Sequence, residues 1–98
     1  MDITKNVAGE EATVALAGRL DTVTAPELEK ELAEILPNVK SLVLDFAQLE
    51  YLSSAGLRVL LNTQKIMSKV GKMVIKNVND IIMDVFDMTG FSSILTIE

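Results

Sequence analysis

The chain of 98 residues contains no cysteine and no histidine. Disulfide bonds, thiol nucleophiles, zinc sites built from Cys and His, and catalytic triads that depend on histidine are therefore excluded. Tryptophan is also absent, and aromatic residues make up only 4% of the chain, so the core has to be aliphatic. Any chemistry must come from carboxylates, hydroxyl groups or lysines.

Basic residues are also few. The chain has nine Lys and Arg residues and 14 Asp and Glu residues, which gives a formal net charge of −5. The basic residues form no cluster in the sequence. Nucleic-acid-binding proteins carry a basic surface, and anionic membranes repel an acidic one, so we expect no nucleic acid and no membrane as partner. An acidic surface does suit a basic protein partner. Without an apolar run of ~18 residues or a signal peptide, we expect a cytoplasmic location.

No linker, repeat or low-complexity segment divides the chain, and 49% of its residues are hydrophobic. We therefore expect a single folded domain over residues 1–98. The hydrophobic patterns predict strands over residues 2–7, 12–17, 41–45 and 72–76, helices that begin near residues 24, 54 and 79, and a last strand or capping segment over residues 94–97. This alternation indicates an α/β fold with a mostly parallel sheet of four to five strands. An N-terminal antiparallel hairpin opens the sheet, and helices pack against it.

The ends of the predicted helices carry recognisable signals. Thr24 and Glu27 are spaced as a capping box at the start of the first helix. Gly71 and Gly90 follow the second and third helices, and Gly71 suits the left-handed residue that often ends a helix. The methionines are expected to fill the core, among them Met67, Met73 and Met88.

Sites in open sheets lie beyond the carboxyl ends of the strands, which directs attention to residues 21–24 and 46–54. Ser53 and Ser54 stand just before a helical stripe, where a serine hydroxyl commonly caps the helix. A second interpretation is a phosphorylation site. The free N–H groups and positive dipole of a helix start can hold a phosphoryl group, so the surface changes while the fold stays intact.

Three further residues have competing interpretations. A glycine in the first turn of a helix lowers stability by up to ~1 kcal/mol relative to alanine, so the presence of Gly56 needs a reason. The favoured reason is a close approach of the helix start to a neighbouring strand, and the alternative is a partner that docks against bare backbone. Asp21 either accepts hydrogen bonds from local backbone N–H groups or contacts a partner. An enzyme that used Asp21 or Asp45 as acid or base would need a deep polar pocket, and we expect none.

The segment YLSSAGLRVLL resembles the signature of STAS domains, and in particular of bacterial anti-sigma factor antagonists. Their usual motif is Asp-Ser-(Ser/Thr/Ala)-Gly-Leu, in which the Ser two places before the Gly accepts a phosphate. That Ser corresponds to Ser54 here, followed by Gly56 and Leu57. The resemblance continues in three further segments, over residues 18–26, 72–76 and 86–91.

The resemblance implies a STAS-like single domain that is not an enzyme and needs no cofactor or metal of its own. It implies that the unphosphorylated chain binds an anti-sigma factor that is also a serine kinase, and so releases a sigma factor. Phosphorylation of Ser54 would end that binding, and a serine phosphatase would restore it. The predicted frame and partner-binding residues are Ser53, Gly56, Asp21, Thr22 and Arg58, in a monomer or weak dimer.

One position departs from the family pattern, because Ser53 stands where Asp usually precedes the acceptor. A serine can still cap the helix but carries no charge, and Ser53 becomes a second candidate acceptor. STAS-like domains also include scaffolds that are not phosphorylated, in stress-signalling complexes or as small subunits of lipid-transporting ABC systems. An assembly subunit of that kind is the alternative function.

Overall fold

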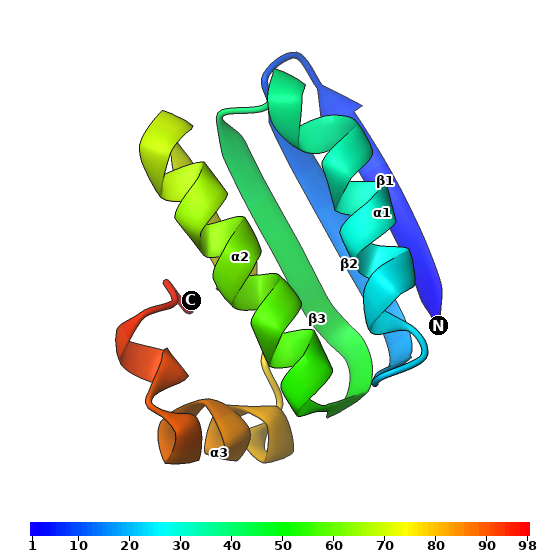
Figure 1. Cartoon of the computed structure of the whole chain (residues 1–98), viewed down its shortest axis with the longest axis vertical. Helices are drawn as coiled ribbons and strands as arrows, with labels where there is room; N and C mark the ends of the chain where they lie inside the picture. Colours follow the sequence, from blue (N-terminus) through cyan, green and yellow to red (C-terminus); the bar gives the residue numbers. More distant parts are fainter.

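The computed structural model describes residues 1–98 and shows a sheet with α1 and α2 lying side by side across one face (Figure 1). In chain order the elements are β1 (Asp2–Ala8), β2 (Glu11–Leu20), α1 (Ala25–Ile35), a 3₁₀ turn η1 (Leu36–Asn38), β3 (Ser41–Leu52), α2 (Ser54–Val70), β4 (Lys72–Lys76), α3 (Asp80–Thr89) and a 3₁₀ turn η2 (Phe91–Ser93). None of the helices has both the length and the apolar composition needed to cross a lipid bilayer.

The four strands lie in the spatial order β1-β2-β3-β4. β1 pairs with β2 antiparallel, whereas β2, β3 and β4 are parallel. The predicted α/β class, the mostly parallel sheet and the N-terminal hairpin are therefore confirmed. Residues 94–97 form no fifth strand. They make a single bridge between Ile97 and Ile75, in which the Ile75 amide donates to the Thr96 carbonyl at 2.9 Å.

β3 is much longer than the predicted strand over residues 41–45, and the expected connection over residues 46–52 was wrong. Phe46, Leu49 and Leu52 are buried, and the segment continues to pair with β2 as far as Leu52. Two register shifts interrupt that pairing, one of them beside Gly18, whose φ is +104°. These bulges break the regular alternation of polar and apolar residues, so the second half of the strand has the pattern of a loop.

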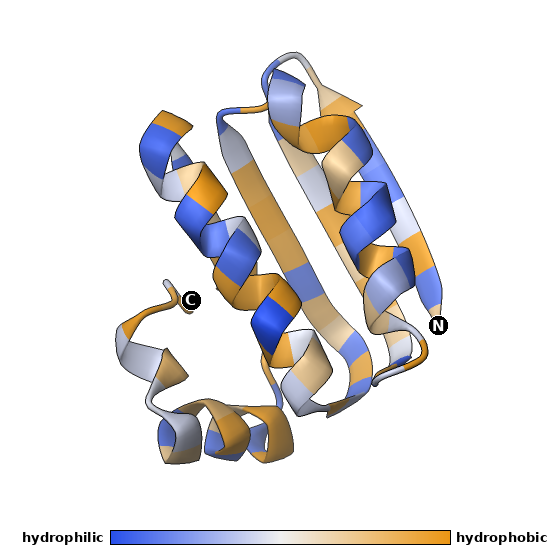
Figure 2. Ribbon diagram, in the orientation of Figure 1, coloured by the Kyte–Doolittle hydropathy of each residue, from blue (hydrophilic) through white to orange (hydrophobic).

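The core is built from aliphatic side chains between the sheet and the helices, as the composition predicts. Figure 2 shows hydrophobic residues running along β3, while α1 and α2 alternate hydrophobic and hydrophilic positions as amphipathic helices do. Two aromatic residues join α3 to this core, because the rings of Phe46 and Phe86 lie 6.5 Å apart.

Two expectations about particular residues were wrong. Met67 and Met73 are buried as predicted, but Met88 is 86% exposed, because α3 packs through Ile82 and Phe86 and turns Met88 away. Gly71 is not left-handed, since its φ of 178° is ordinary extended backbone. A Cβ at that position would overlap the carbonyl group of Lys40, so close approach of two backbone segments explains the glycine. Gly90 does adopt a left-handed conformation, with φ of 81°.

Candidate functional site

The two serines before α2 have different structural roles. Ser53 is the N-cap, with extended backbone and a side-chain oxygen that accepts a hydrogen bond from the Gly56 amide at 3.4 Å. Ser54 is the first residue of the helix and is exposed, and its hydroxyl forms no hydrogen bond within the chain. The capping interpretation therefore holds for Ser53, and the Ser54 hydroxyl stays available for chemistry.

The backbone fixes this helix start against the end of the sheet. The Ser53 amide donates to the Leu20 carbonyl at 2.9 Å, and the Leu57 amide donates to the Ser53 carbonyl at 3.0 Å. No acidic residue lies in the first turn of α2. The first amides of a helix have no acceptor within it and form the positive end of its dipole, so an anion on Ser54 would be stabilised there.

Gly56 is buried where α2 lies close to the two strands before it. A Cβ on Gly56 would stand 2.7 Å from Leu20 Cγ and 2.7 Å from Leu52 Cδ1. This confirms the close-approach explanation for the glycine, because the residue lies against the core and not on a surface open to a partner. The lack of a side chain on Gly56 thus lets the start of α2, which carries Ser54, pack closely against the sheet.

The loop between β2 and α1 begins next to this helix start, because Asp21 follows the residue that bonds Ser53. The Asp21 carboxylate accepts hydrogen bonds at 3.0 Å from the amides of Val23 and Thr24. These bonds, that of Thr24 first, lower the pKa of Asp21 below its ordinary value, so the residue stays ionised. Asp21 is satisfied locally, as one of its two interpretations predicts, while Thr22 and Val23 remain exposed.

The capping box predicted for Thr24 and Glu27 was wrong. Thr24 has helical backbone angles and makes no cap bond. Its hydroxyl instead donates to the Arg19 carbonyl at 2.7 Å and accepts from the Asp21 amide at 2.9 Å. Asp21 therefore starts the turn into α1, and Thr24 closes the loop back onto β2. Asp21 and Thr24 both have side chains that can cap a helix, and the spacing from Thr24 to Glu27 favoured Thr24 for this role.

Both arginines of the chain lie at this end of the molecule. Arg58 is exposed on α2, one turn after Ser54, and forms no ion pair or hydrogen bond through its side chain. Arg19 stacks over the ring of Tyr51, 4.1 Å from its centroid, and lies 4.0 Å from the Asp21 carboxylate. The sequence did not reveal the Arg19–Tyr51 contact, because it depends on the second half of β3, which has the pattern of a loop.

The other candidate carboxylate is remote from this site. Asp45 lies seven residues before Leu52 on β3, about 20 Å from the loop of Asp21 at the usual rise of a strand. Its carboxylate accepts from Asn77 Nδ2 at 2.9 Å and from the Ala47 amide at 2.9 Å, and these bonds lower the pKa of Asp45. The two carboxylates therefore do not form an acid–base pair.

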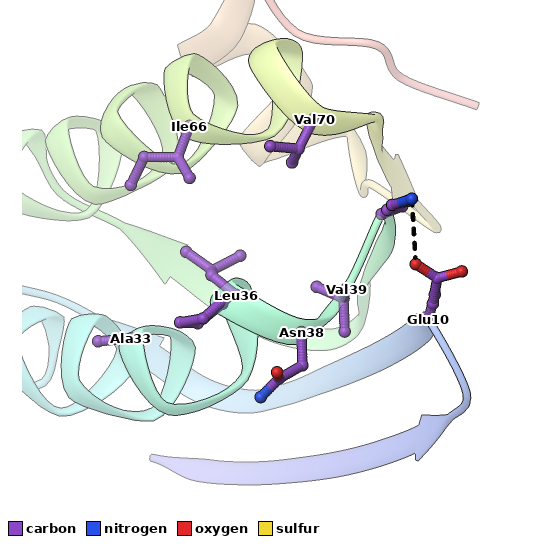
Figure 3. Close-up of a pocket in the computed structure, with 9 residues that line it drawn as sticks. Glu10, Ala33, Leu36, Asn38, Val39, Ile66 and Val70 are labelled. Atoms are coloured by element: carbon purple, nitrogen blue, oxygen red, sulfur yellow. Dashed lines mark ion pairs between the residues drawn. The ribbon is translucent and has the colours of Figure 1, made fainter.

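The cavities of the structure lie elsewhere. One cavity of about 620 Å³ opens between α1 and α2 near their C-terminal ends, with Ile66 and Val70 facing Leu36 and Val39 across it (Figure 3). Neither Asp21 nor Asp45 lines any cavity. No three acidic side chains come close enough together to hold a metal ion.

Comparison with known proteins places this geometry in a family. A family model described as the Mlab STAS domain matches residues 3–96. The chain belongs to the STAS domain family. Within it, BtrV of Bordetella bronchiseptica, named as a candidate anti-sigma factor antagonist, is 37% identical to this STAS domain over 84 residues, which make up 84% of the chain and 72% of BtrV.

Two further proteins are similar to the chain, one in sequence and one in fold. The anti-sigma-B factor antagonist of Bacillus subtilis is 29% identical over 86 residues, covering 87% of this STAS domain and 79% of that protein. The structure of the Bacillus cell fate determinant SpoIIAA in its phosphorylated form matches with a TM-score of 0.78 at 18% identity, over 99% of this chain and 91% of that one. The SpoIIAA comparison concerns the fold, which the two chains share.

Proposed function

We propose that this STAS domain is an anti-sigma factor antagonist whose binding is switched off by phosphorylation of Ser54. The observation that carries the proposal is the exposed, unbonded hydroxyl of Ser54 at the start of α2, which a backbone bond from Ser53 to Leu20 holds at the end of β2. The names of the related proteins support the general role. The existence of SpoIIAA in a phosphorylated form supports the switch.

In the proposed mechanism the unphosphorylated chain binds an anti-sigma factor through Ser54, Asp21, Thr22 and Arg58, and the sigma factor is released. The anti-sigma factor is also a serine kinase, and it transfers the γ-phosphoryl group of its ATP to the Ser54 oxygen. The phosphate brings a charge of about −1.5 to −2 into the interface. Burying that charge without compensation costs several kcal/mol, which weakens binding by roughly a hundredfold or more.

The remaining parts of the proposal follow from this role. Residues 1–98 act as one domain, as a monomer or weak dimer in the cytoplasm, and Ser54 is a substrate and not a catalyst. ATP and Mg²⁺ belong to the kinase, and a serine phosphatase restores the hydroxyl. Ser53 and Gly56 hold the acceptor in place, since the first caps α2 and the second lets its first turn lie against Leu20 and Leu52.

The test is incubation with the cognate anti-sigma factor and ATP, followed by intact-protein mass measurement. We expect one added phosphate on the wild-type chain and on Ser53→Ala, and none on Ser54→Ala. If Ser53→Ala gained no phosphate and Ser54→Ala still gained one, the acceptor would be Ser53. A chain that stays unmodified in a stable complex with that kinase would contradict the switch.

A second candidate function is an assembly subunit of a lipid-transporting ABC system, which the Mlab description of the matching family favours. The start of α2 would then dock permanently on its partner, and phosphorylation would play no part. The two candidates differ in their response to nucleotide. A complex with transporter subunits that survives purification with and without ATP, and is lost on Ser54→Glu, would support the assembly role.

A further inference from the structure

Arg58 is an unpaired cation on the helix that carries Ser54. The chain forms five ion pairs, and Arg58 takes part in none of them. Its side chain is exposed and makes no hydrogen bond, whereas the other arginine, Arg19, already contacts Tyr51 and Asp21. Of the two arginines at this end of the molecule, Arg58 is therefore the one whose charge is not already engaged within the chain.

Helix geometry brings Arg58 to Ser54. The two residues lie four positions apart in α2, which puts their Cβ atoms about 5–6 Å apart on one face. The Cα–Cβ bonds of a helix point toward its N-terminus, so a side chain as long as that of Arg58 can reach the turn that begins with Ser54. A guanidinium presents parallel N–H groups that match two phosphate oxygens at once.

A guanidinium would add to the stabilisation that the free amides of the helix start give to a phosphate on Ser54. The nearby Asp21 carboxylate is ionised and held by the Val23 and Thr24 amides, so it opposes a second negative charge at the start of α2. The remaining cations of α2, Lys65 and Lys69, lie eleven and fifteen residues further on, more than 16 Å along the helix axis at about 1.5 Å per residue. Arg58 is the cation of α2 within reach.

We propose that Arg58 is the internal counter-ion of phosphorylated Ser54. The inference rests on the proposed function, because it concerns the phosphorylated state of the same serine. Before phosphorylation Arg58 offers its charge to an acidic side chain of the partner. After phosphorylation the phosphate binds Arg58, so the modification removes a cation from the docking surface as well as adding an anion to it.

The experiment uses the full chain with phosphoserine incorporated at position 54 during synthesis, so that no kinase is needed. The second pKa of the phosphate, ordinarily ~6, is measured by phosphorus NMR in the wild type and in Arg58→Gln. We expect it to be lower in the wild type by about half a pH unit, because the guanidinium stabilises the dianion. Lys65→Gln, a cation exposed on the same helix, is the matched control and should leave the value unchanged.

Arg58→Lys separates charge from geometry. A lysine keeps the charge but loses the paired N–H groups, so we expect only part of the difference to remain. Equal phosphate pKa values in the wild type and Arg58→Gln, or an equal change in Lys65→Gln, would overturn the proposal. Since the phosphate is installed directly, such a result says nothing about whether a kinase modifies Ser54. Circular dichroism of each variant verifies that the fold is retained.

Discussion

At the scale of single residues, the pair Ser53 and Ser54 shows what sequence can and cannot assign. A serine before a helix predicts a cap, but two adjacent serines leave open which one caps. The structure assigns the cap to Ser53 because its backbone is extended, whereas Ser54 is already helical. Conformation, and not residue type, separates the two hydroxyls.

Gly56 gives a prediction at this scale. The substitution Gly56→Ala adds a methyl group 2.7 Å from the side chains of Leu20 and Leu52. We expect a loss of about 1–2 kcal/mol in the free energy of unfolding, because overpacking outweighs the better helix propensity of alanine. Urea denaturation measures the loss.

The control for Gly56→Ala is Asn62→Ala, an exposed position of the same helix. There the better propensity of alanine has no steric opposition, so the free energy of unfolding should stay level or rise by a few tenths of a kcal/mol, roughly. If Gly56→Ala were as stable as Asn62→Ala, the close packing of α2 on the sheet would have to be looser than described.

Asp21 gives a prediction about pH. Its pKa is lower in the folded chain than in the unfolded chain, so its ionised form stabilises the fold above the unfolded value of ~3.9, and this contribution disappears as the pH falls through the folded value. Asp21→Ala should therefore melt below the wild type at pH 7, and the difference should shrink below pH 4. Thermal melts at both pH values measure it, and a constant difference would mean that the ionised form contributes nothing.

At the scale of elements, the sequence predicts helices better than strand lengths. Each of the three helices appears where its hydrophobic spacing and breakers indicate, because the period of 3.6 residues survives unchanged along a helix. The predicted strand over residues 41–45 is shorter than β3 because bulges shift the alternation of polar and apolar residues. They lie opposite the neighbouring strand after Ala15 and again at Gly18. Beyond Asp45, β3 stays extended because it pairs with β2. The local sequence of β3 does not contain this pairing, so it could not be predicted from the segment alone.

The packing of α3 gives a prediction at this scale. Phe86 is fully buried against Phe46, whereas Met88, two residues later, is 86% exposed. Phe86→Ala should cost about 3–5 kcal/mol of unfolding free energy, because a buried ring leaves a cavity. Met88→Ala should change it by less than about 0.5 kcal/mol. Chemical denaturation of the two variants compares them directly, and a large loss from Met88→Ala would contradict the exposed placement of that side chain.

At the scale of the whole molecule, the parallel strands β2 and β3 form the centre and the remaining elements surround them. This arrangement followed from the order of predicted elements, since strands that alternate with helices favour a parallel sheet. The surface around Ser54 was predicted only in part. Short motifs directed attention to Asp21, Ser54 and Arg58, but the Arg19–Tyr51 contact depends on how β2 and β3 pair at their ends.

Hydrogen exchange tests this arrangement. Buried amides with neighbours on both sides open only with the whole fold, whereas peripheral ones open locally. We expect the slowest exchange in β2 and β3, and faster exchange in β1, which has one neighbouring strand, and in residues 91–98, which join the sheet through a single bridge. Exchange of β3 as fast as that of the last eight residues would be incompatible with its central position.

The antiparallel direction of β1 decides where a probe can be attached. Met1 lies beside Gly18, at the Ser54 end of the sheet, so a fluorophore attached at Met1 would lie at the same end of the sheet as Ser54. Ala8 is exposed at the opposite end of β1, about 24 Å from Met1 at the usual rise per residue. Because the chain has no native thiol, Ala8→Cys would supply a unique point for labelling or surface immobilisation and leave the Ser54 end of the sheet unobstructed.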